Sequence, residues 1–190
     1  GIDSVSKEIK KLYKKNIKRI LLAAKKNNKD IWREACISLD LPISCKESFI
    51  WMYRLHEPKI KLNSKILKFL REKQKNLRKI VILTDGRSIA QRKKIINLGL
   101  ENLPSYISEE YNSKKPALLR FKLIMKKYKN CEYIYVGDNS SKDFIAPNKL
   151  GWVTIGIKNK KDMIHKTSKK NIKNYYLPRY WIRDISQLKI

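Results

Sequence analysis

Two stretches of sequence decide the fold: KIVILTDGR at residues 79–87 and YIYVGDNSSKD at residues 133–143. Each is a short continuous apolar run that passes directly into polar residues and glycine, a pattern typical of a parallel strand buried on both faces. A third apolar run, WVTIGI, follows at residues 152–157. Because helical patterns lie between the runs, the order strand–helix–strand–helix–strand predicts an α/β fold with a parallel sheet.

The N-terminal third of the chain has the pattern of helices. Apolar residues at helical spacing form one stripe over residues 9–24, with lysines opposite. The series Ser44-Cys45-Lys46-Glu47 has the capping-box pattern, which predicts that a helix begins there. We therefore divide the chain into a helical region, residues 1–76, and an α/β core, residues 77–190.

The chain of 190 residues is strongly basic, with 45 Lys and Arg against 17 Asp and Glu and a net charge of +28. A clustered charge of this size would suit nucleic acid. Here the lysines are spread along the whole chain without a nucleic-acid-binding motif, which argues against such a partner. No apolar run approaches the roughly 18 residues of a membrane span. Three scattered cysteines indicate a reduced, cytoplasmic protein, and the oligomeric state stays open.

The loop after the second run carries two carboxylates, Asp138 and Asp143, five positions apart across a strand-to-helix turn. Mg²⁺ commonly binds through one or two carboxylates and keeps several waters, so this pair is a candidate metal site. The alternative is a helix-capping Asp beside a surface Asp. The spacing alone favours neither interpretation.

A lysine directly ahead of a helix, Lys115, lies between the two strands and is followed by Pro116. A lysine held at a helix start can neutralise a phosphoryl group or an acidic nucleophile. In a chain this rich in lysine, a solvent-exposed side chain is the alternative, and the dipeptide by itself favours that alternative.

The order of these signals closely resembles the haloacid dehalogenase superfamily over residues 78–157. The sequence has an apolar strand ending in Thr84, then Lys115-Pro116, then a strand ending in Gly137-Asp138-(x)4-Asp143, then a third strand. The resemblance implies a Rossmann-like three-layer parallel-sheet core, with residues before 77 as a small helical cap. It also implies that Thr84 binds the phosphoryl group, that Lys115 stabilises the nucleophile and the phosphoryl charge, and that Asp138 and Asp143 help to hold Mg²⁺.

Further residues are assigned to the substrate on the same basis. Asp85 and Gly86 belong to the motif of Thr84, and we assign them to substrate binding. In the cap, the most polar cluster is Tyr53, Arg54 and His56, from which we assign Arg54 to substrate selection; packing at a helix end is the alternative. Lys114 competes for the lysine role, but Lys115 matches the Lys-Pro pattern.

One motif of the family does not occur in the 190 residues. Members begin with an apolar strand ending in Asp-x-Asp, whose first Asp attacks phosphorus and whose second is the acid/base. Asp3, Asp40 and Asp85 are each followed two positions on by another residue type. We expect the motif upstream of Gly1, on a central strand whose loss leaves both neighbours unpaired. The alternatives are an inert member, or a strand supplied by another chain.

The resemblance implies a Mg²⁺-dependent phosphohydrolase that acts on a small phosphorylated metabolite through an aspartyl-phosphate. Residues 1–190 alone are then expected to be inactive, because the nucleophile lies outside them. A catalytically inert binding or scaffold module of the same fold is the first alternative. A basic nucleic-acid-binding protein is the second.

Overall fold

The computed structural model describes residues 1–75, 79–158 and 174–188. These residues form two compact units. One is helical and contains residues 1–61 and 87–102; the other is an α/β unit that contains residues 62–86 and 103–190. No helix in the described ranges is both long and apolar enough to cross a membrane.

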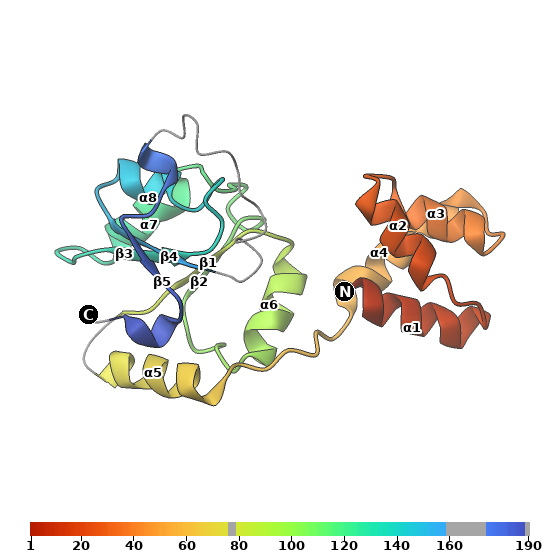
Figure 1. Cartoon of the computed structure of the whole chain (residues 1–190), viewed down its shortest axis with the longest axis horizontal. Coiled ribbons are helices and arrows are strands. Elements are labelled where there is room, and N and C mark those ends of the chain that lie inside the picture. Colours follow the sequence, from red (N-terminus) through yellow and green to blue (C-terminus); the bar gives the residue numbers. More distant parts are fainter. Residues whose placement is uncertain (76–78, 159–173, 189–190) are drawn as a thin grey trace. The chain divides into compact units, whose positions relative to one another are not determined.

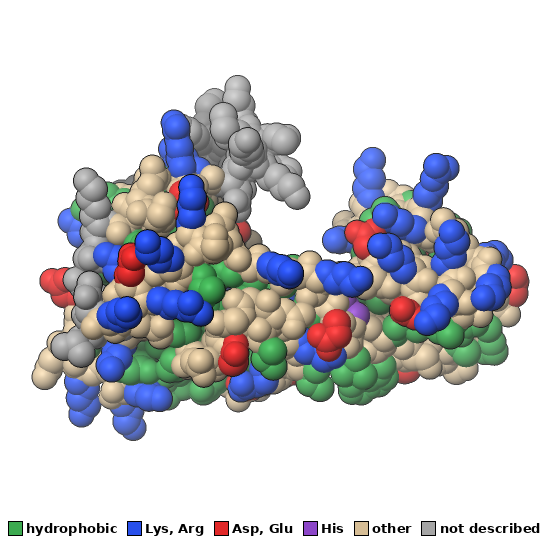
Figure 2. All heavy atoms as spheres, turned by 90° about the horizontal axis from the view of Figure 1, so that it is seen from below, with side chains coloured by type: hydrophobic (Ala, Val, Ile, Leu, Met, Phe, Trp, Pro, Cys, Tyr) green, Lys and Arg blue, Asp and Glu red, His purple; other side chains and the backbone are tan. Residues whose placement is uncertain are grey.

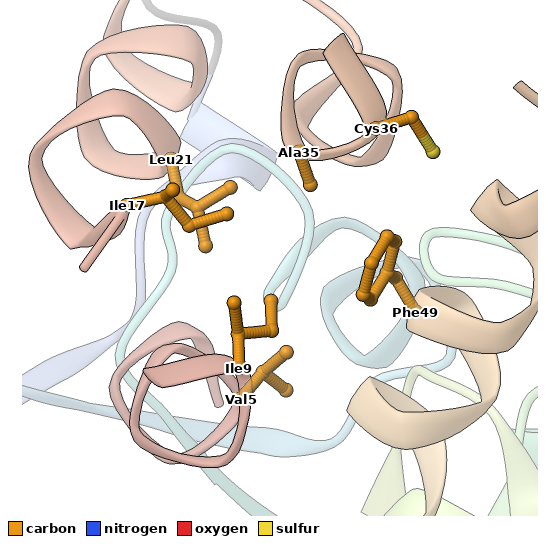
Figure 3. Close-up of a cluster of buried hydrophobic side chains, with 7 residues drawn as sticks. All are labelled: Val5, Ile9, Ile17, Leu21, Ala35, Cys36 and Phe49. Carbon is orange, nitrogen blue, oxygen red and sulfur yellow. The ribbon is translucent and has the colours of Figure 1, made fainter. Parts of the chain in front are cut away.

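The helical unit closes around an apolar centre (Figure 3). Its helices are α1 (Ile2–Tyr13), α2 (Lys18–Lys26), α3 (Ile31–Ser38), the short 3-10 helix η1 (Ile43–Cys45), α4 (Lys46–Leu55) and α6 (Ser88–Asn97). The residues that fill its centre are Val5, Ile9, Ile17, Leu21, Ala35, Cys36 and Phe49.

The apolar spacing over residues 9–24 predicted one continuous helix, but the structure has two helices there. Lys14 adopts a left-handed conformation with φ 54° and ends α1, and α2 begins at Lys18. Ile17, the N-cap residue of α2, and Leu21 within α2 therefore pack in the same apolar cluster as Ile9. The predicted capping box at residues 44–47 is also not formed, since α4 follows η1 directly without a side-chain cap.

The α/β unit contains parallel strands, which confirms the predicted fold class. The strands are β1 (Ile82–Thr84), β2 (Ser105–Ile107), β3 (Ile134–Gly137), β4 (Val153–Ile157) and β5 (Tyr180–Ile182), and the helices are α5 (Ser64–Lys75), α7 (Leu119–Lys127), α8 (Ile145–Lys149), η2 (Asn174–Tyr176) and η3 (Ile185–Gln187). Figure 1 shows α7 and α8 on one side of the strands and α5 on the other. The strand β2 was missed by the sequence analysis.

The strands form two separate parallel ladders. β1 pairs with β2, and β4 lies between β3 and β5. Both ladders contribute to one apolar core, because Leu83 of β1 packs against the cluster that contains Tyr106 of β2 and Tyr135 of β3. Within the described residues, β1 and β3 thus share a core while each has one edge without a strand partner.

The boundary between the compact units differs from the predicted boundary at residues 76 and 77. The helix α5 precedes that boundary but belongs to the α/β unit, and α6 follows it but belongs to the helical unit. α5 packs against η3 in the α/β unit. α6 is fastened to the helical unit, where Lys93 forms an ion pair with Glu57 at 2.6 Å and Asn97 donates a hydrogen bond to the Pro58 carbonyl. The division into a cap and a core stays a prediction about function.

On the face shown in Figure 2, the basic residues do not form a single patch. Lys and Arg side chains there are scattered over both units, with acidic and apolar side chains between them. On this face, the distribution agrees with the even spread of basic residues along the sequence and favours solvated side chains over a groove for a polyanion.

Candidate active site at the strand ends

The predicted site residues Thr84, Lys115 and Asp143 come from three loops of the α/β unit. Thr84 is the last residue of β1, and Asp138 directly follows β3. In parallel sheets the loops beyond the carboxyl ends of the strands are where ligands bind. The structure joins these loops through a network of hydrogen bonds and ion pairs centred on Lys115 and Asp85.

Lys115 and Asp143 form a buried ion pair. Lys115 Nζ lies 2.6 Å from Asp143 Oδ1, and the two side chains are 10% and 4% exposed. Lys115 Nζ also donates a hydrogen bond to the Tyr135 hydroxyl at 3.1 Å. Removing one partner of such a pair leaves an uncompensated buried charge, so each group strongly requires the other. Its neighbour Lys114 is exposed.

Asp143 also builds the loop that follows β3. Its Oδ2 atom accepts hydrogen bonds from the backbone amides of Asp138 at 3.2 Å and Asn139 at 3.0 Å. Gly137 makes this approach possible, because a Cβ atom there would lie 2.8 Å from Asp143 Oδ2. Both oxygens of Asp143 therefore face protein groups, and the residue holds Asp138 and Lys115 in place.

Asp85 connects the other loops. Its carboxylate accepts from Arg120 Nη2 at 2.5 Å and from the backbone amide of Lys115 at 3.2 Å, and lies 3.5 Å from Lys142 Nζ. Burial alone would raise the pKa of Asp85, but the hydrogen bonds from Arg120 and the Lys115 amide lower it below its usual range. Asp85 is therefore ionised and bound by protein groups.

Arg120 connects the end of β1, the end of β2 and Asp85 through hydrogen bonds. Its side chain is fully buried, and Nη1 donates to the carbonyls of Thr84 at 2.8 Å and Tyr106 at 3.0 Å. It thereby ties the end of β1 to β2 while neutralising Asp85. The sequence analysis missed Arg120, whose only signal was a charge on the apolar face of the helix α7.

Gly86 shapes the loop after β1. Its φ of 148° lies in a region that favours glycine. Its amide donates to Ser108 Oγ at 2.9 Å, and the Ser108 hydroxyl in turn lies 3.3 Å from the Gly86 carbonyl. Ser108, which the sequence analysis did not single out, thus fixes this loop from the end of β2.

The chain matches the family of haloacid dehalogenase-like hydrolases over residues 2–157. It belongs to this family. The match includes the N-terminal helices as well as residues 78–157, on which the motifs lie. Arg120, Ser108 and Tyr135 lie outside the motifs by which the sequence resembles this family.

Similar proteins include phosphatases. A glyceraldehyde 3-phosphate phosphatase of Methanocaldococcus jannaschii is 38% identical over 83 residues, which are 42% of this chain and 36% of that protein. The chain therefore matches only about a third of this curated relative's length.

Two solved structures of haloacid dehalogenase-like proteins have the same fold. A phosphatase of Thermococcus onnurineus gives a TM-score of 0.57 at 18% identity, covering 98% of this chain and 83% of that one. The hydrolase YfnB of Bacillus subtilis, solved with magnesium bound, gives 0.55 at 17% identity, covering 95% and 80%. At these identities the likeness shows the fold alone.

The residues present fit Mg²⁺ as part of a site. The described residues contain no group of three or more His, Cys, Asp or Glu that could hold a metal. Asp143 contacts Lys115 and the Asp138 amide, and Asp138 itself is exposed at the strand end. Because Mg²⁺ often takes one or two carboxylates together with waters and substrate phosphate, Asp138 suits a direct ligand. The assignments of Asp138 and Asp143 as ligands both stay predictions.

Arg54 lies in the helical unit rather than among the strand-end residues. It is part of α4, half-buried, with its guanidinium 5.3 Å from the centre of the Trp51 ring. This stacking fixes the stem of the side chain. Its role in substrate selection stays a prediction, as do the substrate-binding roles of Asp85 and Gly86.

Proposed function

We propose that this haloacid dehalogenase-like protein is a Mg²⁺-dependent phosphohydrolase that acts on a small phosphorylated metabolite. The observation that carries the proposal is the nearly buried ammonium of Lys115, held by Asp143 and Tyr135 beyond the ends of parallel strands. A cation fixed in a poorly solvated place stabilises a phosphoryl group far better than a surface lysine does.

The site residues divide the work on the phosphoryl group. Thr84 and the loop of Asp85 and Gly86 bind its oxygens, and Lys115 offsets the charge that develops on them. Asp138 holds Mg²⁺, which when bound supplies further neutralisation of the phosphoryl oxygens. Asp143 acts through its neighbours, since it orients both Lys115 and the backbone at Asp138.

The unpaired edges of β1 and β3 support a further strand between them. We place there one parallel strand from outside residues 1–190, ending in Asp-x-Asp. Its first carboxylate attacks phosphorus and displaces the alcohol, which takes a proton from the second. Water then attacks the aspartyl-phosphate and gives a proton back to the second carboxylate, and this step releases inorganic phosphate and regenerates both groups. The net reaction converts a phosphate ester and water into an alcohol and phosphate.

The helical region selects the organic part of the substrate in this proposal, with Arg54 as a binding residue. The name of the archaeal relative makes short phosphorylated aldehydes the first substrates to assay. Three free cysteines suit a reduced, cytoplasmic compartment, in which such metabolites occur.

The test compares residues 1–190 with a chain extended through the encoded upstream residues. We expect the extended chain to hydrolyse p-nitrophenyl phosphate and some small phosphorylated metabolites, with activity lost in EDTA and restored by Mg²⁺. Residues 1–190 alone should be slower by about 10⁴-fold or more, because the nucleophile is missing.

A matched pair of variants tests the site itself. Lys115→Met should lower turnover of the extended chain by at least about 10²-fold, as losses of transition-state donors do, whereas Lys114→Met should leave it unchanged. Metal-dependent turnover by residues 1–190 alone would contradict the placement of the nucleophile. An upstream sequence without Asp-x-Asp would instead favour an inert binding module.

A further inference from the structure

Tyr135 holds the Lys115 ammonium together with Asp143, but it belongs to none of the motifs that carry the family resemblance. It lies in the middle of β3, and the residue is 7% exposed. Its ring packs against Phe121 at 5.4 Å and Phe144 at 6.4 Å between centroids. The hydroxyl is therefore carried on a rigid, aromatic-packed support, and it lies 3.1 Å from Lys115 Nζ.

The contacts of Lys115 leave little freedom to its ammonium group. An ammonium has three N–H donors. The hydrogen bond to Tyr135 fixes the direction of one of them, and the Asp143 carboxylate faces the ammonium in an ion pair that lacks hydrogen-bond geometry. The hydrogen bond to Tyr135 thereby restricts the directions of the remaining N–H groups, one of which can meet an incoming phosphoryl oxygen.

The chemical state of Tyr135 suits this role. Burial raises the pKa of its phenol far above the usual range, and the nearby carboxylates of Asp143 and Asp85 raise it further. The hydroxyl consequently stays neutral and accepts from Lys115 without adding a second negative charge. Asp143 supplies the charge that balances the ammonium, while Tyr135 supplies direction.

We propose that Tyr135 is a positioning residue, which orients the ammonium of Lys115 so that one of its other N–H groups meets the phosphoryl group of the substrate. The inference rests on the proposed function and extends it to a residue outside the motifs. It predicts that the Tyr135 hydroxyl contributes to turnover only through Lys115, and contributes little to folding.

The test uses Tyr135→Phe in the extended chain, with Tyr133→Phe as the matched control. Phenylalanine keeps the ring contacts and removes only the hydroxyl. Tyr133 precedes β3, and its hydroxyl binds main-chain carbonyls of Met125 and Tyr128 rather than Lys115. We expect Tyr135→Phe to lower kcat for p-nitrophenyl phosphate about tenfold, with KM changed less than about twofold. Tyr133→Phe should leave both constants unchanged.

A double-mutant cycle asks whether the effect passes through Lys115. Tyr135→Phe should weaken inhibition by orthovanadate, a mimic of the transition state, about fivefold in the wild-type background, and not at all in Lys115→Met. An equal loss in both backgrounds would overturn the proposal. So would an unchanged kcat, or loss of the cooperative unfolding transition in Tyr135→Phe, because positioning requires a native fold.

A readout independent of turnover separates this inference from the proposed function. The rate at which acetic anhydride labels Lys115 is measured by peptide mass spectrometry, with the exposed Lys114 as internal reference. Tyr135→Phe should raise labelling of Lys115 severalfold relative to Lys114. If no phosphate ester is hydrolysed by the wild type, the proposed function fails, and this ratio alone decides whether Tyr135 holds Lys115. An unchanged ratio overturns the inference in either case.

Discussion

The centres of the two units differ in chemistry. The helical unit is filled by aliphatic and aromatic side chains, and its ion pairs, such as Lys15 with Asp40, lie on the surface. In the α/β unit, Arg120 and Asp143 are buried beside an aromatic core. A buried ion pair is often no more stable than apolar residues of the same volume. The charges at the strand ends therefore indicate a function that an apolar centre cannot perform.

The largest effect is expected from breaking the apolar centre of the helical unit. Phe49 is 1% exposed and packs beside Tyr13. Phe49→Ala should lower the free energy of unfolding by about 4 kcal/mol, since it removes a large buried ring and leaves a cavity. Urea denaturation followed by circular dichroism measures the change. Ile37→Ala, at a side chain that is 53% exposed, should cost far less; equal losses would show that this centre is not packed as described.

Breaking the charged centre should have a slightly smaller effect on stability. Arg120→Met removes one donor from the Thr84 and Tyr106 carbonyls and the charged partner of Asp85, which keeps the Lys115 amide. We expect a loss of about 3 kcal/mol in the same denaturation experiment, because three buried hydrogen bonds are lost and the Asp85 charge loses its main partner.

The control for Arg120 is Lys15→Met, which breaks a surface pair. Lys15 and Asp40 are 3.4 Å apart and mostly exposed, and such pairs contribute little in water. Its denaturation midpoint should stay at the wild-type value. If Arg120→Met also left the denaturation midpoint unchanged, the buried charges would not contribute to stability, and the comparison between the two units would fail.

The close packing at the end of β3 gives a third test. Gly137→Ala would place a Cβ atom 2.8 Å from Asp143 Oδ2 and 3.0 Å from the Tyr135 ring. The strain should lower stability by about 1–3 kcal/mol. It should also reduce phosphatase turnover more than the stability loss explains, because Asp143 holds Lys115. Thermal unfolding and steady-state kinetics on one preparation separate the two effects, and wild-type values in both would contradict the packing.

The smallest expected effect is on how the free energy of unfolding depends on acidic pH. The pKa of Asp85 is lower in the folded protein, where Arg120 and the Lys115 amide bind the carboxylate. Its contribution is therefore fully present above the unfolded-state pKa of about 3.9 and is lost as pH falls through the folded pKa. Unfolding free energies between pH 7 and pH 3 should show a weaker decline at the acid end in Asp85→Asn than in the wild type. Parallel curves would contradict an ionised, bound Asp85.

The sequence predicts most of the α/β unit because its main strands are continuous apolar runs. The runs at residues 79–83, 133–136 and 152–157 correspond to β1, β3 and β4, and their ends differ by at most three residues. β2 has only three residues, too few to show a periodicity. The end of α1 at Lys14 is marked by neither glycine nor proline, so the stripe over residues 9–24 gave no sign of the break.

The candidate site divides in the same way. Thr84, Lys115, Asp138 and Asp143 follow from local motifs, and the structure joins their loops at the strand ends. Tyr135 and Arg120 acquire their partners only through tertiary folding, since Arg120 binds Asp85 from 35 residues away. A buried arginine among 45 basic residues has no local signature.

The way Arg120 is bonded also sets which positions can drift in evolution. At Thr84 and Tyr106 it contacts only main-chain carbonyls, which every amino acid possesses. The bonds to Arg120 therefore place no requirement on the identity of the side chains at these two positions. Asp85 is different, because its side chain is itself the partner. Among descendants of this protein, residues 85 and 120 should therefore be exchanged together, whereas positions 84 and 106 vary independently of Arg120.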